Sequence, residues 1–323
     1  MIPYFDLHCD TISECALKGV SLRDNRSLHV SLERGKALGP WFQCFAVWIP
    51  DESDSPLQRF RLAADCLKKE ARNHSDLFTL CQSQENLKKI AKDCGIGAIL
   101  TVEGGSVLEG RLEVLEELSA SGVKMITLTW NRANEIGGGA MEPGGLTPFG
   151  QQVLKEMGRL EILPDVSHAS DPLFWETAEA VQGPLVASHS NSRKVCPHPR
   201  NLTDDQFREI CRRGGLVGLN FYREFLTPSG QCGMEAILSH AEHFLSLGGE
   251  DVLAMGSDFD GAEMPQGIEG IQSIEFLAEC FLRHGYAESL VKKIFYQNSF
   301  SFFQKHMANQ VKSPGAFDNR EKL

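Results

Sequence analysis

The sequence lacks the features of a membrane or secreted protein. Its 323 residues contain no uninterrupted apolar run of the roughly 18 residues that a transmembrane helix needs. The first ten residues, MIPYFDLHCD, do not show the basic and then apolar segments of a secretory signal. The polar C-terminal stretch, VKSPGAFDNREKL, carries no anchor signal. We therefore expect a cytoplasmic protein with no membrane partner.

The sequence also lacks the features of a nucleic-acid-binding or disulfide-rich protein. Its 32 Lys and Arg are outnumbered by 43 Asp and Glu, and the net charge of −11 comes with no long basic cluster. Such a charge disfavours binding to a phosphate backbone. The 10 Cys are scattered and none forms a C-x-x-C pair. We therefore expect no nucleic-acid partner, no cysteine-type zinc site and free thiols.

Short apolar segments recur between longer helical patterns. Most of these segments are apolar on both faces, as buried strands of a parallel sheet are. Helical patterns lie between most of them, for example at 55–73, 147–160 and 202–215. Eight strands that alternate with helices predict an α/β protein with a (β/α)8 TIM-type barrel. The expected strands are 4–10, 42–49, 97–104, 123–130, 161–168, 184–190, 215–222 and 252–259.

The pattern predicts one domain over residues 1–308, a single barrel. The first crossover, 11–41, looks irregular, and residues 270–308 are expected to add extra C-terminal helices after the eighth strand. Residues 309–323 are predicted to form a flexible C-terminal tail.

Metal-ligand side chains stand at the ends of five of the expected strands. Barrel active sites lie at the C-terminal ends of the strands, so residues there are candidate functional residues. Side chains at i and i+2 of a strand point the same way, so the first strand can offer a His and an Asp to one cation. A lone His at a strand end is usually structural. The occurrence of several histidines and carboxylates at five strand ends of one barrel is what points to a metal site. The candidates are His8, Asp10, Glu103, His168, His189 and Asp258, with Asp260 just beyond the last strand.

Three His and two carboxylates exceed the ligands that one tetrahedral ion needs. Neutral imidazole and carboxylate suit Zn²⁺ or a similar divalent ion. Two ions bridged by one carboxylate would use the whole set, and Glu103 is the natural bridge. Other histidines are expected to be structural or surface residues; His240 and His243 lie on a helical segment and are expected to face solvent.

The same motifs resemble those of the renal (membrane) dipeptidase family, peptidase family M19, of the amidohydrolase-like superfamily. The resemblance runs from about residue 4 to 304 and includes DLHCD, TVEGG, DVSH, SHSNSRKVCPHPRN, LNFY and GSDFDG in this order. It implies two zinc ions and a dipeptide substrate. It assigns one ion to His8 and Asp10, the other to His168 and His189, the bridge to Glu103, the acid/base role to Asp258 and the grip on the substrate carboxylate to Arg200.

The sequence departs from the family pattern in the substrate pocket. Mammalian members carry a histidine where this chain has Trp130, which can donate a hydrogen bond but cannot act as an imidazolium. Asn131 or Asn134 is an alternative polar contact, and Phe225 stands where mammalian members have a tyrosine. The expected substrate contacts are Arg200, Trp130, Asn131 and Tyr222.

The sequence thus predicts a zinc-dependent dipeptidase that cleaves short peptides with a hydroxide held between two ions. The family suggests tolerance of a C-terminal D-residue. A homodimer is left open.

The first alternative is another binuclear amidohydrolase, such as a small amidase, lactonase or phosphoesterase. Many of these enzymes bridge their metals with a modified lysine at the end of the fourth strand, whereas this strand ends in Thr129-Trp130 and Lys124 lies at its opposite end. The second alternative is a non-catalytic binding protein, which predicts the loss of a ligand; none is lost.

Overall fold

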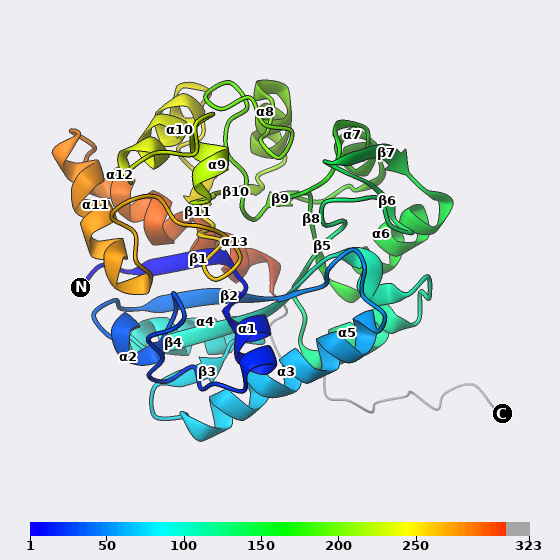
Figure 1. Cartoon of the computed structure of the whole chain (residues 1–323), viewed down its shortest axis with the longest axis horizontal. Helices are drawn as coiled ribbons and strands as arrows, with labels where there is room; N and C mark the ends of the chain where they lie inside the picture. The colour runs from blue at the N-terminus through cyan, green and yellow to red at the C-terminus, as the bar shows by residue number, and fades with distance from the viewer. Residues whose placement is uncertain (308–323) are drawn as a thin grey trace.

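The computed structural model describes residues 1–307, and the predicted tail, 309–323, lies outside the described residues. Eight parallel strands close into a barrel, because β2 pairs with β1 along one edge and with β4 along the other (Figure 1). The prediction of a TIM-type barrel is confirmed. The order around the barrel is β1 (Tyr4–Cys9), β2 (Trp41–Trp48), β4 (Ile96–Glu103), β5 (Met125–Thr127), β8 (Leu163–Asp165), β9 (Val186–Ala187), β10 (Leu216–Leu219) and β11 (Leu253–Met255).

Each of the eight expected strands is present, but several are shorter than predicted. The segment 123–130, for instance, is paired as β5 only over Met125–Thr127. Beyond these short ladders the chain turns into the loops of the barrel mouth. Most of the predicted strand ends therefore lie in irregular backbone, where their polar side chains can turn toward the barrel axis; His8 and Glu103, by contrast, lie within β1 and β4.

Two small β elements were not predicted. The strand β3 (Phe78–Leu80) pairs with the first residues of β4, while β5 pairs with the last residues of β4 on the same edge. The strands β6 (Gly137–Gly139) and β7 (Glu142–Leu146) form an antiparallel hairpin outside the barrel. Three residues in β3 and three glycines in β6 are too little for an apolar alternation to be recognised.

Helices surround the barrel, and some of them begin at recognisable side-chain caps. Thr147 accepts a hydrogen bond from Gly150 N–H, and Thr203 and Gln206 form a reciprocal capping box, as the sequence suggests. The first crossover is irregular, as predicted. The helices are α1 (Thr11–Lys18), α2 (Leu32–Gly35), α3 (Pro56–Asn73), α4 (Gln84–Lys92), η1 (Gly105–Leu108), α5 (Val114–Ser121), α6 (Pro148–Leu160), α7 (Asp171–Ala180), α8 (Asp204–Arg212), α9 (Arg223–Leu226) and α10 (Glu235–Ser246).

The last of the predicted C-terminal helices closes the barrel at the end opposite the mouth. Phe303 stacks on Phe5 with ring centroids 5.1 Å apart, and Phe5 in turn stacks on Phe42. These rings belong to an apolar cluster that the first residues of the strands share with the last helix. The segment comprises η2 (Ile271–Ser273), α11 (Ile274–Arg283), α12 (Glu288–Lys292), the π-helical turn η3 (Lys293–Gln297) and α13 (Asn298–His306).

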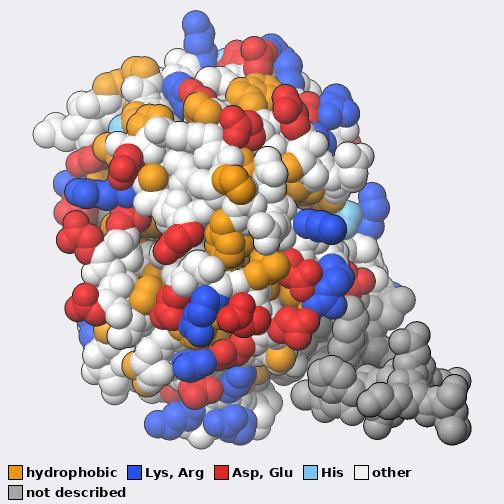
Figure 2. Space-filling model, turned by 90° about the vertical axis from the view of Figure 1, so that its right-hand side faces the viewer, with side chains coloured by type: hydrophobic (Ala, Val, Ile, Leu, Met, Phe, Trp, Pro, Cys, Tyr) orange, Lys and Arg blue, Asp and Glu red, His pale blue; other side chains and the backbone are white. Residues whose placement is uncertain are grey.

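The surface carries mixed charge. On the face drawn in Figure 2, acidic and basic side chains are interspersed and apolar side chains are scattered between them. All ten cysteines are free, as the sequence suggests. No helix in residues 1–307 is both long and apolar enough to span a bilayer.

Candidate metal centre

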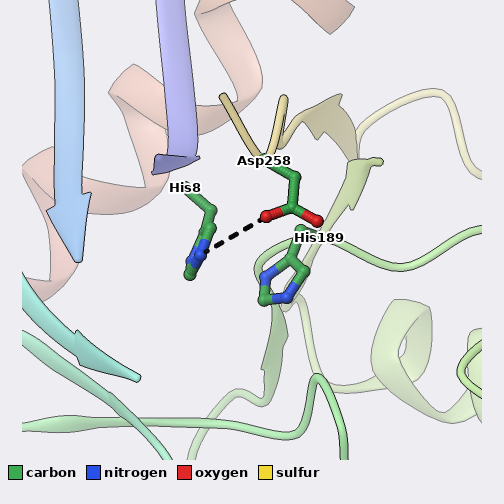
Figure 3. A group of neighbouring side chains, drawn as sticks. All are labelled: His8, His189 and Asp258. Atoms are coloured by element: carbon green, nitrogen blue, oxygen red, sulfur yellow. Dashed lines mark ion pairs between the residues drawn. The ribbon is translucent and has the colours of Figure 1, made fainter. Parts of the chain in front are cut away.

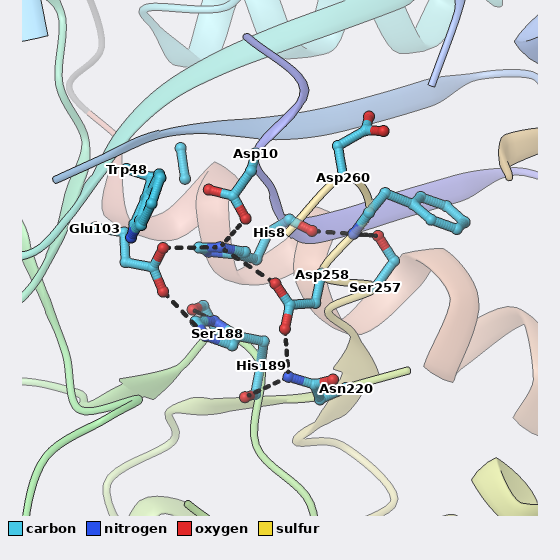
Figure 4. A network of polar contacts seen from close by, with 12 residues as sticks. His8, Asp10, Trp48, Glu103, Ser188, His189, Asn220, Ser257, Asp258 and Asp260 are labelled. Atoms are coloured by element: carbon cyan, nitrogen blue, oxygen red, sulfur yellow. Dashed lines mark hydrogen bonds and ion pairs between the residues drawn. The ribbon is translucent and has the colours of Figure 1, made fainter. Parts of the chain in front are cut away.

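The six predicted metal-site residues meet at one end of the barrel. His8 lies near the end of β1 and Asp10 directly follows that strand, while Glu103 is the last residue of β4. His168, His189 and Asp258 lie just beyond β8, β9 and β11. The five metal-ligand candidates are at most 6% exposed, and the Asp258 side chain is 13% exposed. Figure 4 shows the polar groups of His8, Asp10, Glu103, His189 and Asp258 pointing toward one another from different strands. The structure therefore brings together His8, Asp10, Glu103, His168, His189 and Asp258.

Glu103 stands between two sets of imidazole nitrogens. Its Oε1 lies 2.8 Å from His168 Nε2 and 3.3 Å from His189 Nε2. Its other oxygen, Oε2, lies 3.7 Å from His8 Nε2. The two oxygens of one carboxylate thus face two different groups of ligand atoms, which is the geometry that a bridging ligand requires.

The polar atoms around His8 are arranged as donors to a cation. His8 Nε2 lies 3.5 Å from Asp10 Oδ2 and 3.9 Å from Asp258 Oδ1, and the latter contact is drawn in Figure 3. Among residues 1–307, His8 Nε2 and Asp10 Oδ1 are buried and have no hydrogen-bond partner. Buried polar atoms without a partner are costly, so a divalent cation fits this cluster. The overlapping ligand groups are His8–Asp10–Glu103, Glu103–His168–His189 and His8–His189–Asp258.

The cluster has an excess of negative charge. Burial acts to lower the pKa of His8, but the carboxylates of Glu103 and Asp10 outweigh it and raise that pKa to about 10. Burial raises the pKa of Glu103 well above its usual range, and it lowers the pKa values of His168 and His189 well below theirs. Two neutral imidazoles beside buried carboxylates favour a bound cation, whether a proton or a metal ion.

Two of the imidazoles are held in orientation by neighbouring polar groups. Asn131 Oδ1 lies 3.1 Å from His168 Nδ1, and Ser188 Oγ lies 2.7 Å from His189 Nδ1. The Ser188 hydroxyl donates to Asp165 Oδ2 at 2.6 Å. Because each Nδ1 is engaged in this way, each Nε2 can offer its lone pair to a metal, and the two Nε2 atoms face each other at 2.9 Å.

Asp258 is fixed through one of its oxygens. Asn220 Nδ2 donates to Asp258 Oδ2 at 3.0 Å, and Oδ1 is the oxygen that faces His8. Burial raises the pKa of Asp258 to about 6. Both Asp258 and His168 adopt left-handed backbone conformations, with φ of 61° and 67°. Such conformations are uncommon for non-glycine residues and concentrate at functional sites.

Glycines allow the strands beneath His189 to approach closely. A Cβ atom at Gly218 or at Gly256 would lie 1.9 Å from the Ser188 carbonyl oxygen. The backbones of β10 and of the turn after β11 therefore pack directly on the chain that carries Ser188 and His189. This close approach is what brings Asn220 and Asp258 to the ligand cluster.

A cavity of about 530 Å³ opens above the ligand cluster. Trp130, Asn131 and Tyr222, which were predicted to contact the substrate, line it together with Phe225. Trp48 at the end of β2, Glu14 on α1 and Glu263 also line it and were not predicted from the sequence. No local pattern distinguishes Trp48, the last residue of β2, from the other apolar residues of that strand.

Arg200 lies close to this cavity, beneath Phe225. Its side chain is 4% exposed, and its guanidinium carbon lies 5.3 Å from the centre of the Phe225 ring. Burial lowers the pKa of Arg200 to about 10. Within the described chain its Nε has no hydrogen-bond partner and no carboxylate oxygen lies within ion-pair distance. A buried guanidinium without an anion is costly, so the site favours an incoming carboxylate.

Two other residues considered in the sequence have structural roles. Asn134, the alternative to Asn131, holds a turn by accepting hydrogen bonds from Ile136 and Gly137 N–H. Asp260 borders the cavity, but its carboxylate accepts hydrogen bonds from Thr11 Oγ1 and His29 N–H. Neither is therefore free for a substrate.

The expectation that His240 faces solvent is wrong. His240 is fully buried on α10, accepts from Ser192 N–H at 3.0 Å and contacts the Leu226 carbonyl at 3.0 Å. It follows Ile237 by three positions and precedes Phe244 by four, so it lies on the apolar face of the helix. The periodicity of this helix could have shown it. His243 is partly exposed and pairs with Asp204.

A closed parallel barrel with histidines and carboxylates gathered at its C-terminal mouth is the architecture of a metal-dependent hydrolase. The sequence matches the model of the membrane dipeptidase family (peptidase family M19) over residues 1–315. The chain belongs to this family and is a metallo-dipeptidase.

Several relatives support this assignment. Dipeptidase 3 of Mus musculus is 31% identical over 249 residues, which are 74% of this chain and 49% of that protein, so the alignment spans about half of the mouse protein. A metallopeptidase from Rhodobacter sphaeroides, crystallised with a phosphinate mimic of the dipeptide L-Ala-D-Ala, superposes with a TM-score of 0.87 at 28% identity, over 95% of this chain and 99% of that one. A second structure, described as the dipeptidase AC of family M19, gives 0.88 at 29% identity, over 96% and 99%.

Proposed function

We propose that the protein is a zinc-dependent dipeptidase that hydrolyses the peptide bond of short peptides, including dipeptides with a C-terminal D-residue. In this proposal His8 and Asp10 hold one ion, His168 and His189 hold the other, and Glu103 bridges them. The observation that carries the proposal is the placement of Glu103, whose two oxygens face these two sets of ligands at 2.8–3.7 Å.

The donor set supports zinc. Neutral imidazole nitrogens and carboxylate oxygens suit Zn²⁺, and the lowered pKa values of His168 and His189 leave both neutral. Ions bound here would supply an activated water near neutral pH and would polarise the peptide carbonyl.

Asp258 is proposed as the general acid and base. Its Oδ2 is held by Asn220, so Oδ1 is the oxygen available to take a proton from the attacking water and return it to the leaving amine. Its pKa of about 6 suits both transfers near neutral pH. Asp258 also lies close enough to His8 and His189 to bind an ion together with them. A variant described in the Discussion separates the two roles.

Arg200 is proposed to bind the free carboxylate of the substrate. A guanidinium can pair bidentately with a carboxylate, which a lysine cannot reproduce. The buried side chain, the unpartnered Nε and the neighbouring cavity support this role. Such a contact would restrict substrates to peptides whose C-terminus lies next to the scissile bond. The dipeptide mimic bound by the Rhodobacter sphaeroides relative is consistent with that restriction.

An activity screen tests the proposal. Zinc-loaded protein would be assayed on L,L-, L,D- and D,D-dipeptides, with a C-amidated dipeptide, a small lactone and a phosphotriester as comparison substrates. We expect cleavage of L,L- and L,D-dipeptides and little cleavage of the other compounds. Turnover of the lactone or phosphotriester with none of the dipeptides would contradict the proposal.

A further inference from the structure

Two of the four tryptophans of the chain form one wall of the cavity. Trp48 and Trp130 both line it, and their rings meet edge to face with centroids 5.1 Å apart at 71°. Trp130 also lies 6.4 Å from the His168 ring, so the wall stands directly beside the ligand cluster. We call Trp48 and Trp130 the tryptophan wall.

The tryptophan wall is held rigidly. Trp48 is the last residue of β2, where its backbone is paired with Glu103 of β4. Arg59 of α3 donates from Nε to the Trp48 carbonyl at 2.8 Å, and its guanidinium lies 4.9 Å from the centre of the Trp48 ring. Trp48 is thus fixed by strand pairing and by a cation over its ring, and Trp130 packs edge to face against it.

The tryptophan wall lies across the barrel mouth from Arg200. Trp48 ends β2 and Trp130 follows β5, so the pair flanks β4. Phe225, the ring over Arg200, follows β10, and β10 is diametrically opposite β4 in the closed order of eight strands. A dipeptide whose carboxylate is bound at Arg200 therefore points its N-terminal residue toward Trp48 and Trp130.

We propose that the tryptophan wall binds the side chain of the substrate's N-terminal residue and makes the enzyme prefer a large apolar side chain, aromatic or branched, at that position. This inference rests on the proposed dipeptidase function and names its substrate class. Contact between the flat indole rings and an apolar side chain removes apolar surface of both from water, and this burial is the main favourable contribution to binding. An acidic side chain would meet the carboxylates of Glu14 and Glu263 in the same cavity.

A basic side chain is the competing occupant, because Glu14 borders the cavity. Glu14 already pairs with Lys18, at 2.7 Å, and exposed ion pairs add little affinity. The structure therefore favours the apolar occupant over the basic one.

The test compares dipeptides X-Ala on the zinc-loaded enzyme, with X as Gly, Ala, Leu, Phe, Glu or Lys. We expect kcat/KM for Phe-Ala and Leu-Ala to exceed that for Ala-Ala at least tenfold, which corresponds to about 1.4 kcal/mol. Trp130→Ala should reduce this ratio to less than about threefold, and Trp130→Phe should restore most of it. Trp175→Ala is the matched control, because Trp175 lies on α7 away from the cavity and is 40% exposed; it should keep the parent ratio.

Equal kcat/KM for Phe-Ala and Ala-Ala, a preference for Lys-Ala, or an unchanged ratio in Trp130→Ala would overturn the inference. Metal content and melting temperature of each variant identify one that has not folded. Trp130→Phe then carries the test: the smaller ring covers less apolar area and should give a ratio measurably below the parent's, and an unchanged ratio overturns the inference. If no dipeptide is cleaved, the proposed function fails, and calorimetric binding of the same peptides still decides the inference: tighter binding of Phe-Ala than of Ala-Ala supports it, and equal binding overturns it.

Discussion

At the scale of single residues, Glu103 explains why the histidines lie where they do. It is 3% exposed, and its oxygens face imidazoles from β1 on one side and from the segments after β8 and β9 on the other. A buried carboxylate in this position needs positive charge around it. His8, the one imidazole of the three whose pKa is raised, supplies part of it, and bound ions would supply the rest.

Asp258→Asn separates an acid/base from a metal ligand. Asparagine keeps the shape of the side chain and its contact with Asn220 but cannot take a proton. If Asp258 transfers protons, the variant should retain the parent's metal content and lose roughly 10²-fold or more in kcat, as loss of general acid–base catalysis typically does. Elemental analysis and steady-state kinetics on the same sample give both numbers. Loss of an ion would instead make Asp258 a ligand, and normal turnover with full metal content would exclude the catalytic role.

Arg200→Met tests the grip on the substrate carboxylate. Removing one partner of a buried charge pair costs about 2–5 kcal/mol, so kcat/KM for a dipeptide with a free C-terminus should fall roughly 30- to 4000-fold. Amidating the substrate of the parent enzyme should cause a similar loss. The amidated substrate should hardly distinguish Arg200→Met from the parent, since it never used the contact.

Arg208→Met serves as the control for Arg200→Met, because Arg208 is exposed on α8 and pairs with Asp205 at the surface. It should leave both substrates unaffected. If the parent enzyme cleaves the C-amidated dipeptide as well as the dipeptide with a free C-terminus, Arg200 does not bind the substrate carboxylate.

At the scale of elements, Glu209 and Arg213 join two helices of the barrel wall. Glu209 of α8 accepts from Arg213 Nε at 2.7 Å and from Arg212 Nε at 2.8 Å. Arg213 also donates to the Val181 carbonyl at 2.6 Å, and to that of Ala178, at the C-terminal end of α7. These contacts satisfy carbonyls that the end of α7 leaves unpaired. Hydrogen bonds from the two arginines lower the pKa of Glu209 to about 2.

Glu209→Gln should therefore destabilise the protein in a pH-dependent way. The lowered pKa means that the stabilisation is complete above the ordinary value of 4.5 and is lost as the pH falls toward about 2. We expect a loss of about 1 kcal/mol at neutral pH, since the group is partly solvated, and a smaller difference from the parent near pH 3. Thermal unfolding of the ion-free proteins at both pH values measures it. Asp205→Asn, which breaks an exposed pair, is the control, and a difference that grows in acid would contradict the account.

The sequence predicted the elements that carry strong apolar patterns and missed those that do not. The eight barrel strands and the capped helices α6 and α8 were recognised, because burial and capping leave local signals. The hairpin β6–β7 and the strand β3 were missed, because glycine-rich or three-residue strands have no periodicity.

The candidate ligands could be predicted for the same reason, since they lie at or directly after the strand ends. The residues that hold the ligands in position could not be predicted. Asn220, Ser188 and Asp165 act through contacts across neighbouring strands, and Gly218 acts by having no side chain. Such partners are set by the closed barrel and not by spacing along the chain. Trp48 likewise becomes a cavity residue only because β2 lies beside β4.

At the scale of the whole molecule, the ligand cluster connects strands that are far apart in sequence. Its residues come from β1, β4 and the segments after β8, β9 and β11, so bound ions would link both halves of the barrel. An ion that binds only the folded state adds about 2.7 kcal/mol of stability at a hundred times its dissociation constant.

Removal of the ions should lower the melting temperature. We expect a chelator to reduce it by several degrees, because about 1 kcal/mol corresponds to roughly 2–4 °C in a domain approaching this size. Re-addition of Zn²⁺ should restore the parent value, and Mg²⁺, which prefers oxygen ligands, should restore less. Differential scanning calorimetry at fixed pH gives the comparison. An unchanged melting temperature in the chelator, with loss of metal verified, would show that the site does not stabilise the barrel.

The most direct test of the central claim is the number of ions bound per chain by the parent protein and by Glu103→Gln. Glutamine has the same size but cannot serve as an anionic bridge between two cations. We predict that zinc-saturated parent protein binds two ions per chain and that Glu103→Gln binds fewer, with Glu113→Gln, an exposed glutamate on the surface, as the control that keeps two. Parent protein that saturates at one ion, with Glu103→Gln binding just as well, would contradict the binuclear centre.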